Sequence, residues 1–277
     1  MRVLLWALEA LVVATVAIEG FLYALRRYEL AGSGESGGLR RGVLNVAGSF
    51  VAQCVAVVFS RLGHLASPFW PFAVVRSDRP PVLLLHGHAG SRTALLWLAW
   101  RLRREGFPNV VGVRVGPPGA DAYQKAKALA ATVERVLRDV GAERVDVVAH
   151  SLGGLVARAY VREYGGARRV GRLVTLGTPH QGTRVAAFAI DAAARSLLPG
   201  SRLLADLARE DPVPTLVSVT SIFSPFDAKI LPSRNAVYPG AANVEVDGLG
   251  HDAMLYSPKV LRLVVEALGQ PSRTSNP

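Results

Sequence analysis

The sequence of 277 residues contains very little cysteine and very little lysine. Its only cysteine, Cys54, lies inside an apolar run, so the chain cannot form an intrachain disulfide, and cysteine usage indicates no cellular compartment. The net charge is +11, and 28 of the 32 basic residues are arginine. These arginines are scattered along helix-like stretches beside acidic residues rather than clustered with aromatic ones. We therefore expect no nucleic-acid partner.

Several motifs that carry metal or phosphate chemistry are also missing. The sequence has no C-x-x-C, no H-E-x-x-H and no EF-hand pattern, so it predicts no catalytic metal. A glycine-rich phosphate loop is absent as well. We expect a reaction that needs no cofactor.

Long apolar runs are present, and both lie near the N-terminus. Residues 3–25 are apolar except for Glu9 and Glu19, which is about the length that crosses a hydrocarbon core. Residues 42–60 carry no charge and place their few polar side chains in one weak helical stripe. We predict a membrane-anchoring region over residues 1–76, with 3–25 as a span and 42–60 as either a second span or an interfacial helix. For residues 3–25 the alternatives are a signal peptide or a helix buried in protein.

The arginine pairs that flank the linker between these runs bear on topology. If both runs cross, the positive-inside tendency places the linker in the cytoplasm and the C-terminal domain outside, which is the arrangement we favour. If only the first crosses, the same arginines indicate a cytoplasmic domain. The sequence does not predict an oligomeric state.

From residue 77 to the C-terminus, apolar strands alternate with amphipathic helices. This alternation predicts a mostly parallel sheet covered by helices on both faces, the α/β class. Functional residues in such sheets lie at the carboxyl ends of the strands. The expected strands are 80–87, 109–115, 144–151, 168–179, 213–223 and 242–248, and the expected helices 92–107, 121–141, 152–165 and 258–268.

Ser151 stands between one of these strands and the helix that follows it directly. The chain must reverse within about two residues, which crowds the positions two before and two after the serine. Those positions hold Ala149 and Gly153, both small. A serine that merely caps the helix is the alternative, but a cap does not require small residues at both crowded positions. The pattern favours a nucleophile held on a tight turn.

The stretch "AHSLGG" resembles the nucleophile elbow of α/β-hydrolases, and of bacterial lipases and esterases in particular. It departs from the usual G-x-S-x-G at Ala149. Similar lipase-like segments extend the resemblance over residues 80–270. The stretch "LLLHGHAGS" resembles the oxyanion loop of lipases, which implies that the backbone N–H groups of His88 and Leu152 bind the oxyanion.

The resemblance also implies substrate-contacting residues and a catalytic triad. Around the elbow and the oxyanion loop, substrate contacts are expected from His86, Gly87 and His150. The stretch "LGTPHQGT" implies that Thr178, Pro179 and His180 form a wall of the cleft.

Asp227 and His251 each follow an apolar strand, and the order Ser151, Asp227, His251 is the one expected of this fold. Asp206, Asp211 and Asp247 are alternative acids. Residues 183–211 contain two amphipathic stretches over the mouth of the site, so we expect a lid there, with an ordinary surface helix pair as the alternative.

Together these features predict a membrane-associated serine hydrolase that cleaves lipid or other acyl esters. An acyltransferase or thioesterase, a phospholipid or glycolipid deacylase, and a catalytically inactive membrane scaffold remain open as alternatives.

Overall fold

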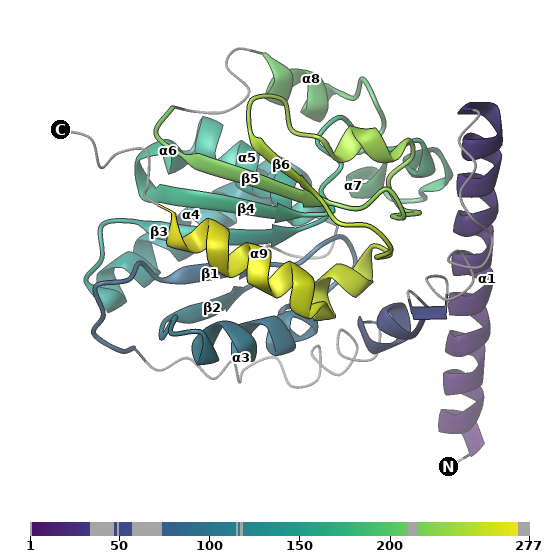
Figure 1. Ribbon diagram of the computed structural model, residues 1–277, viewed down its shortest axis with the longest axis horizontal. Coiled ribbons are helices and arrows are strands. Elements are labelled where there is room, and N and C mark those ends of the chain that lie inside the picture. Colours follow the sequence, from purple (N-terminus) through teal and green to yellow (C-terminus); the bar gives the residue numbers. More distant parts are fainter. Residues whose placement is uncertain are drawn as a thin grey trace.

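A six-stranded parallel sheet forms the centre of the molecule in the computed structural model, which describes residues 2–33, 47–48, 50–56, 74–114, 116, 119–209 and 215–270. The strand order is β2-β1-β3-β4-β5-β6, and every neighbouring pair is parallel (Figure 1). This confirms the predicted α/β fold. The strands are β1 (Val82–Leu85), β2 (Val110–Val113), β3 (Val145–His150), β4 (Val170–Leu176), β5 (Ser218–Phe223) and β6 (Ala242–Glu245).

Helices cover both faces of this sheet. Side chains of α4, α5 and α8 pack against one face in a cluster that includes Leu83 and Leu85. Side chains of α3 and α9 pack against the other face, in a cluster that includes Val82 and Leu84. Neighbouring residues of β1 thus enter opposite cores, as the pleat of a strand requires. The helices are α3 (Leu96–Arg104), α4 (Ala122–Val140), α5 (Leu152–Glu163), α6 (Gly166–Arg169), α7 (Ala192–Arg195), α8 (Arg202–Ala208) and α9 (Pro258–Gly269), and the short 3-10 turns are η1 (Arg92–Leu95), η2 (Arg184–Phe188), η3 (Ser233–Ala236) and η4 (Asp252–Tyr256).

Local signals in the sequence explain where α4 begins and ends. Asp121 accepts a hydrogen bond from the Gln124 N–H, and the Gln124 side chain accepts one from the Asp121 N–H, which completes a capping box. At the other end, Gly141 adopts a left-handed conformation that is strained for other residues. The helix therefore spans nearly the predicted range.

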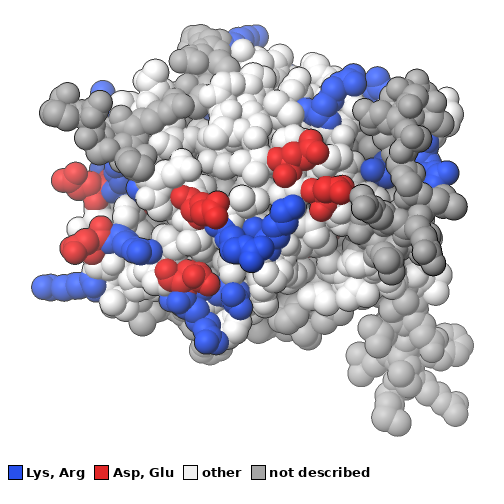
Figure 2. Space-filling view, in the orientation of Figure 1, with Lys and Arg blue, Asp and Glu red and all other residues white. Residues whose placement is uncertain are grey.

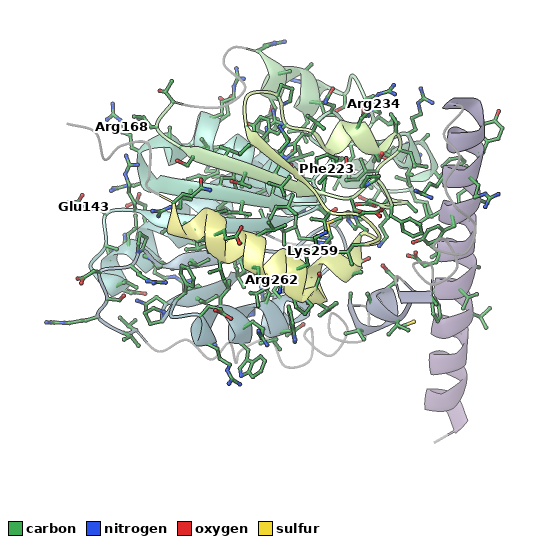
Figure 3. All side chains as sticks on the ribbon, viewed as in Figure 1. Glu143, Arg168, Phe223, Arg234, Lys259 and Arg262 are labelled. Atoms are coloured by element: carbon green, nitrogen blue, oxygen red, sulfur yellow. The ribbon has the colours of Figure 1, made fainter. Side chains whose placement is uncertain are left out.

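The two ends of the sheet carry different segments. Figure 3 shows Glu143 and Arg168, which precede β3 and β4, at the end away from α1 (Arg2–Ser33), and Phe223, the last residue of β5, nearer to α1. The carboxyl ends of the strands, where the predicted site residues lie, therefore face α1.

The N-terminal helix α1 packs one face on the domain. Its buried side chains are Thr15, Glu19, Leu22 and Tyr23, spaced so that they share one side of a helix. Leu22 and Tyr23 contact Phe226 and Ala228, in the loop after β5. The arginine at position 26 donates hydrogen bonds to the Pro225 carbonyl. The helix stands beside the domain as a separate element (Figure 1).

None of the described helices combines the length and the apolar character that a bilayer crossing requires. The predicted span over residues 3–25 is therefore not supported. A physical reason is that the middle of this helix buries a carboxyl group, Glu19, against the domain. Of the second predicted run, only residues 47–48 and 50–56 are described, and they are helical. The predicted membrane localisation stays a prediction.

Charged side chains of both signs are interspersed on the face shown in Figure 2. Arginine and lysine side chains lie beside aspartate and glutamate there, and no single-sign field covers that face. Some of the arginines form ion pairs, such as Arg169 with Glu134, with nitrogen and oxygen 2.8 Å apart.

One buried carboxyl makes folding stability depend on pH. Asp146 on β3 is 1% exposed and pairs with Arg172 at 3.0 Å. Burial raises the pKa of Asp146 to about 6, although Arg172 opposes the rise. Between the ordinary carboxyl pKa and about pH 6, the native state therefore holds a proton on Asp146 that the unfolded chain has lost. This contribution to stability is complete below the ordinary carboxyl pKa and disappears as pH rises through about 6.

We expect the free energy of unfolding of the wild type, relative to Asp146→Asn, to fall by on the order of 2–3 kcal/mol between pH 4 and pH 7.5. Urea unfolding of both proteins at matched pH values measures this difference. A difference that stays constant with pH contradicts the assignment.

Candidate active site

Ser151 occupies a strained position between β3 and α5. Its backbone has φ 55° and ψ −127°, and positive φ is uncommon for a residue other than glycine. The serine caps α5 by position, but its side chain makes no capping hydrogen bond. The turn is held from outside, because Ser151 N donates to the Leu176 carbonyl at 2.9 Å and Thr178 Oγ1 donates to the Ser151 carbonyl at 2.9 Å. These features fit a nucleophile elbow better than a simple helix cap.

Small residues surround the elbow because other backbone segments pass close to it. A Cβ on Gly153 would lie 2.8 Å from the His86 carbonyl oxygen, closer than real Cβ atoms approach. A Cβ on Gly87 would lie 2.8 Å from Ser151 Cβ and 3.3 Å from Ser151 Oγ. The loop after β1 therefore passes directly beside the serine hydroxyl. The predicted crowding around the elbow is confirmed at Gly153.

Asp227 and His251 form a buried pair. Asp227 Oδ2 lies 2.6 Å from His251 Nδ1, and the side chains are 1% and 7% exposed. Asp227 follows β5 and His251 follows β6, so neighbouring strand ends bring together residues that are 24 positions apart. A hydrogen bond this short between buried groups is typical of an acid that orients an imidazole.

The exit of β4 joins this pair to the elbow. Ser151 N donates to the carbonyl of Leu176, the last residue of β4. The next residue, Gly177, packs against the pair, since a Cβ there would lie 3.1 Å from Asp227 Oδ2 and 3.3 Å from His251 Nδ1. The elbow and the Asp227–His251 pair thus both contact the exit of β4. The catalytic roles of Ser151, Asp227 and His251 stay a prediction.

His150 is buried beside the elbow and contacts the loop of His251. Its Nε2–H donates to the His251 carbonyl at 3.2 Å, and the two ring centroids are 4.6 Å apart. Burial, and next the proximity of His251, lower the pKa of His150 to about 3, so the ring is neutral. Its contacts are those of a support for the His251 loop rather than those of the substrate-contacting residue predicted from the sequence.

The loop after β1 provides the predicted oxyanion segment. His86 is half-buried, and its Nδ1 lies 2.9 Å from the Gly87 carbonyl. His88 is exposed, and its Nε2 lies 3.1 Å from Asp191 Oδ2 at the start of α7. As the first residue of α5, Leu152 has no carbonyl one turn earlier to receive its N–H. The geometry is compatible with oxyanion binding by the backbone at His88 and Leu152.

The predicted cleft wall lies inside the domain instead. Thr178, Pro179 and His180 are all buried. His180 Nε2 lies 2.9 Å from Thr175 Oγ1, and the ring stacks on Tyr238 with centroids 4.3 Å apart. Burial holds the pKa of His180 well below its usual value. These residues therefore brace the elbow and the β4 exit, because the chain turns inward after Gly177 and they lack an exposed surface.

The described part of the predicted lid segment forms three short helices, η2 and α7 before Pro199 and α8 after Gly200, where two amphipathic stretches were predicted. The break follows from Pro199 and Gly200, which precede the serine that caps α8. This segment contacts two other parts of the site. Asp191 pairs with His88 of the oxyanion loop, and Phe188 makes an edge-to-face contact with Phe21 of α1 at 5.2 Å.

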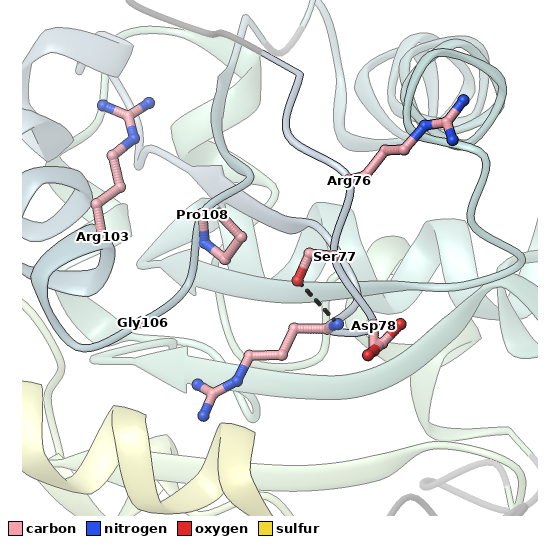
Figure 4. Close-up of a pocket in the computed structure, with 7 residues that line it drawn as sticks. Arg76, Ser77, Asp78, Arg103, Gly106 and Pro108 are labelled. Atoms are coloured by element: carbon pink, nitrogen blue, oxygen red, sulfur yellow. Dashed lines mark hydrogen bonds between the residues drawn. The ribbon is translucent and has the colours of Figure 1, made fainter.

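A separate pocket lies at the opposite end of the sheet. It has a volume of about 520 Å³ and is lined by residues that precede β1 and β2. Figure 4 shows the side chains of Arg76 and Arg103 pointing away from each other, so the pocket presents no converging cationic group. In the part of the chain that the structure describes, no three His, Cys, Asp or Glu side chains are arranged to hold a metal ion.

A parallel sheet, a serine on a strained strand-to-helix turn and a buried Asp–His pair beside it define the class of α/β-hydrolases. The family model described as palmitoyl protein thioesterase matches residues 81–223, which is just over half of the chain. The chain belongs to this family.

Two bacterial proteins are similar in sequence. A triacylglycerol lipase from Burkholderia plantarii is 31% identical over 175 residues, covering 53% of this chain and 44% of that lipase. A triacylglycerol lipase from Pseudarthrobacter phenanthrenivorans is 31% identical over 135 residues, covering 42% of this chain and 38% of that lipase. The chain thus spans less than half the length of either relative.

Solved structures agree on the fold. Aspergillus fumigatus lipase B superposes with a TM-score of 0.64 at 19% identity, covering 73% of this chain and 55% of that one. The mature form of Bacillus licheniformis lipase BlEst2 superposes with a TM-score of 0.60 at 18% identity, covering 70% of this chain and 94% of that one. At this identity the likeness extends to the architecture alone.

Proposed function

We propose that the protein hydrolyses carboxylic esters of acyl chains through an acyl-Ser151 intermediate, with His251 as general base and acid and Asp227 as its orienting acid. The observation that carries this proposal is the buried Asp227–His251 pair, 2.6 Å apart, at the same sheet edge as the strained serine. Such an arrangement has a cost in backbone strain and in buried polar groups, which a purely structural role does not require.

The first half of the reaction forms the acyl-enzyme. A serine hydroxyl is a weak nucleophile at its own pKa, so His251 Nε2 must take its proton as Ser151 Oγ attacks the ester carbonyl. Asp227 accepts a hydrogen bond from the Nδ1–H of His251, which leaves Nε2 free to accept the serine proton. His251 then hands the proton to the departing alcohol, and the acyl group stays on Ser151.

The second half removes the acyl group. Water replaces the alcohol, and His251 accepts a proton from it as the water oxygen attacks the acyl carbonyl. The tetrahedral intermediate then breaks its bond to Ser151 Oγ, which takes the proton back from His251, and the carboxylic acid leaves. In both halves the backbone N–H groups of His88 and Leu152 stabilise the developing oxyanion, a contribution of about 3 kcal/mol for each such donor. The close passage of Gly87 beside Ser151 supports this proposal, because His88 is the next residue along the same loop.

An acyl chain is the favoured substrate because the segments around the site expose apolar side chains. Phe188 and Ile190 of the predicted lid are 61% and 94% exposed, and Phe21 of α1 is 46% exposed. The lipase relatives support lipid esters as the class. The family model favours a second candidate, the thioester of a long acyl chain, which the same residues can hydrolyse in the same two steps.

A fluorophosphonate probe and a set of matched substrates test the proposal. We expect one label per chain, on the peptide that contains Ser151, and no label on Ser151→Ala. Esters of eight or more acyl carbons are expected to exceed the acetate ester at least about tenfold in kcat/KM, since each buried methylene contributes about 0.8 kcal/mol. Paired oxyesters and thioesters of one acyl chain then separate the two candidates.

Ser77→Ala is a matched control, because Ser77 lies at the other end of the sheet, and it should keep the wild-type label and rate. Failure of the folded wild type to label or to hydrolyse any acyl substrate favours an inactive scaffold. Acyl transfer to an added alcohol in preference to water identifies an acyltransferase.

A further inference from the structure

A second ion pair, partly buried, lies directly beside the Asp227–His251 pair. Lys229 comes two residues after the acid, and Asp252 comes immediately after the histidine. Lys229 Nζ lies 2.5 Å from Asp252 Oδ2, and the side chains are 27% and 13% exposed. This ion pair therefore ties the loop after β5 to the loop after β6, across the point where the acid must meet the base.

Lys229 also bonds to three other parts of the site. Its backbone N–H donates to Asp227 Oδ1 at 2.8 Å, so both carboxylate oxygens of Asp227 are held, one by Lys229 and one by His251. Its carbonyl accepts from Thr183 Oγ1, where the predicted lid begins, at 3.0 Å. Its ammonium donates to Gln53 Oε1 in the N-terminal region at 2.5 Å. Neither the family resemblance nor the sequence pattern assigned a role to this lysine.

We infer that Lys229 and Asp252 are positioning residues that hold the catalytic acid and base together and keep their surroundings electrically neutral. The inference rests on the proposed function, since it takes Asp227 and His251 as the acid and the base. Lys229 fixes the free oxygen of the acid and the loop that carries it. Asp252 is the anchor on the loop of the base. A displacement of about 1 Å in such a constellation is enough to slow a reaction about 100-fold.

Charge gives this ion pair a second effect on the site. Burial alone would lower the pKa of Lys229, but Asp252 and Glu19 outweigh burial and raise it. Burial alone would raise the pKa of Asp252, but Lys229 and then His251 outweigh it and hold that pKa at about 2. Both groups are thus charged throughout the working pH range, and together they add almost no net charge next to His251.

The other titratable groups that face the ion pair are Asp227, His150, Tyr256 and, from α1, Glu19. Burial raises the pKa of Glu19, with Lys229 opposing the rise, and its Oε1 has no hydrogen-bond partner. The α1 helix therefore places a carboxyl group over the same lysine. Removal of either member of the ion pair leaves an uncompensated charge of known sign beside the base.

Two single variants test the inference through the pH profile of kcat/KM on the best acyl substrate. In Lys229→Met the Asp252 carboxylate is uncompensated, so protonation of the base is favoured and the acidic limb moves to higher pH. In Asp252→Asn the ammonium is uncompensated, so the limb moves to lower pH. We expect shifts of about one pH unit in opposite directions. We also expect a decrease in kcat of about 10- to 100-fold in each variant.

Matched variants separate this role from ordinary structural damage. Lys259→Met removes an exposed lysine of α9 and should leave the acidic limb of the pH profile unchanged. Lys229→Arg keeps the positive charge, so the acidic limb of its pH profile should lie at the wild-type pH. The double variant Lys229→Met/Asp252→Asn removes both charges, so its acidic limb should lie near the wild-type pH as well. Shifts of both single variants in the same direction, or no shift in either folded variant, overturn the inference.

A readout that does not need turnover keeps the two proposals apart. The titration of the His251 ring is followed by NMR in the Ser151→Ala background, where the same opposite displacements of its midpoint are expected. If the wild type labels at Ser151 but neither readout shows opposite shifts, the positioning role fails and the proposed function stands. If the NMR midpoints shift as expected but the wild type neither labels nor hydrolyses, the proposed function fails alone.

Discussion

Asp227→Asn is expected to lower kcat on any acyl substrate by about 10⁴-fold, with a folded protein and an intact Ser151. The carboxylate oxygen lies 2.6 Å from His251 Nδ1 and accepts a hydrogen bond from its N–H. An amide at this position can present its NH₂ group instead, which stabilises the tautomer with the proton on Nε2. That tautomer cannot take the proton of the serine hydroxyl. A 10⁴-fold decrease corresponds to about 5 kcal/mol of transition-state stabilisation.

Steady-state kinetics with the best acyl ester measures this loss, and Asp247→Asn is the matched control. Asp247 is exposed, and it was one of the alternative acids in the sequence. We expect Asp247→Asn to keep kcat within about twofold of the wild type, as surface substitutions usually have small effects. If Asp227→Asn retains more than a tenth of the activity, or if Asp247→Asn loses most of it, Asp227 is not the acid.

The strands and the elbow could be predicted from the sequence because their signals are local. Apolar runs between turn residues predicted all six strands, and the spacing of Ala149, Ser151 and Gly153 predicted the tight turn. The order of serine, acid and histidine then indicated which strand ends must meet. None of these inferences needed a distance, because a parallel sheet gathers the ends of its strands at one edge.

The predictions that failed depended on contacts between distant residues. The apolar composition of α1 indicated a membrane helix, but only the fold reveals that its buried stripe, with Glu19, packs against the loop after β5. The resemblance of the segment around His180 to a lipase segment implied a cleft wall, whereas the ring of His180 is buried and stacks on Tyr238, 58 residues later in the sequence. Lys229 carried only one signal, its place two residues after the acid. Its role depends on the contact with Asp252, and the sequence alone does not show that these two residues are neighbours.

A second large effect is expected at Gly154, where α5 passes the β4 exit. A Cβ there would lie 2.1 Å from Thr178 Oγ1 and 2.7 Å from its Cγ2. Thr178 is fully buried, and its hydroxyl donates to the Ser151 carbonyl, so it cannot move aside without releasing the elbow. Gly154→Ala is therefore expected to lower the free energy of unfolding by about 3 kcal/mol, the upper end for overpacking. It should also reduce kcat, because the serine loses its support.

Urea unfolding measures the effect, and two further variants locate its cause. Gly269→Ala adds a methyl group where nothing lies within 4 Å, so its stability should stay within about 1 kcal/mol of the wild type. Thr178→Ala alone removes one buried hydrogen bond, a loss of about 1 kcal/mol. In the Gly154→Ala background, Thr178→Ala removes Oγ1 and Cγ2, the two atoms that lie closest to the added methyl group. The double variant should therefore be clearly more stable than the sum of the two single effects predicts. Strict additivity would mean that the glycine is required for some reason other than the threonine, and that the elbow does not depend on this contact.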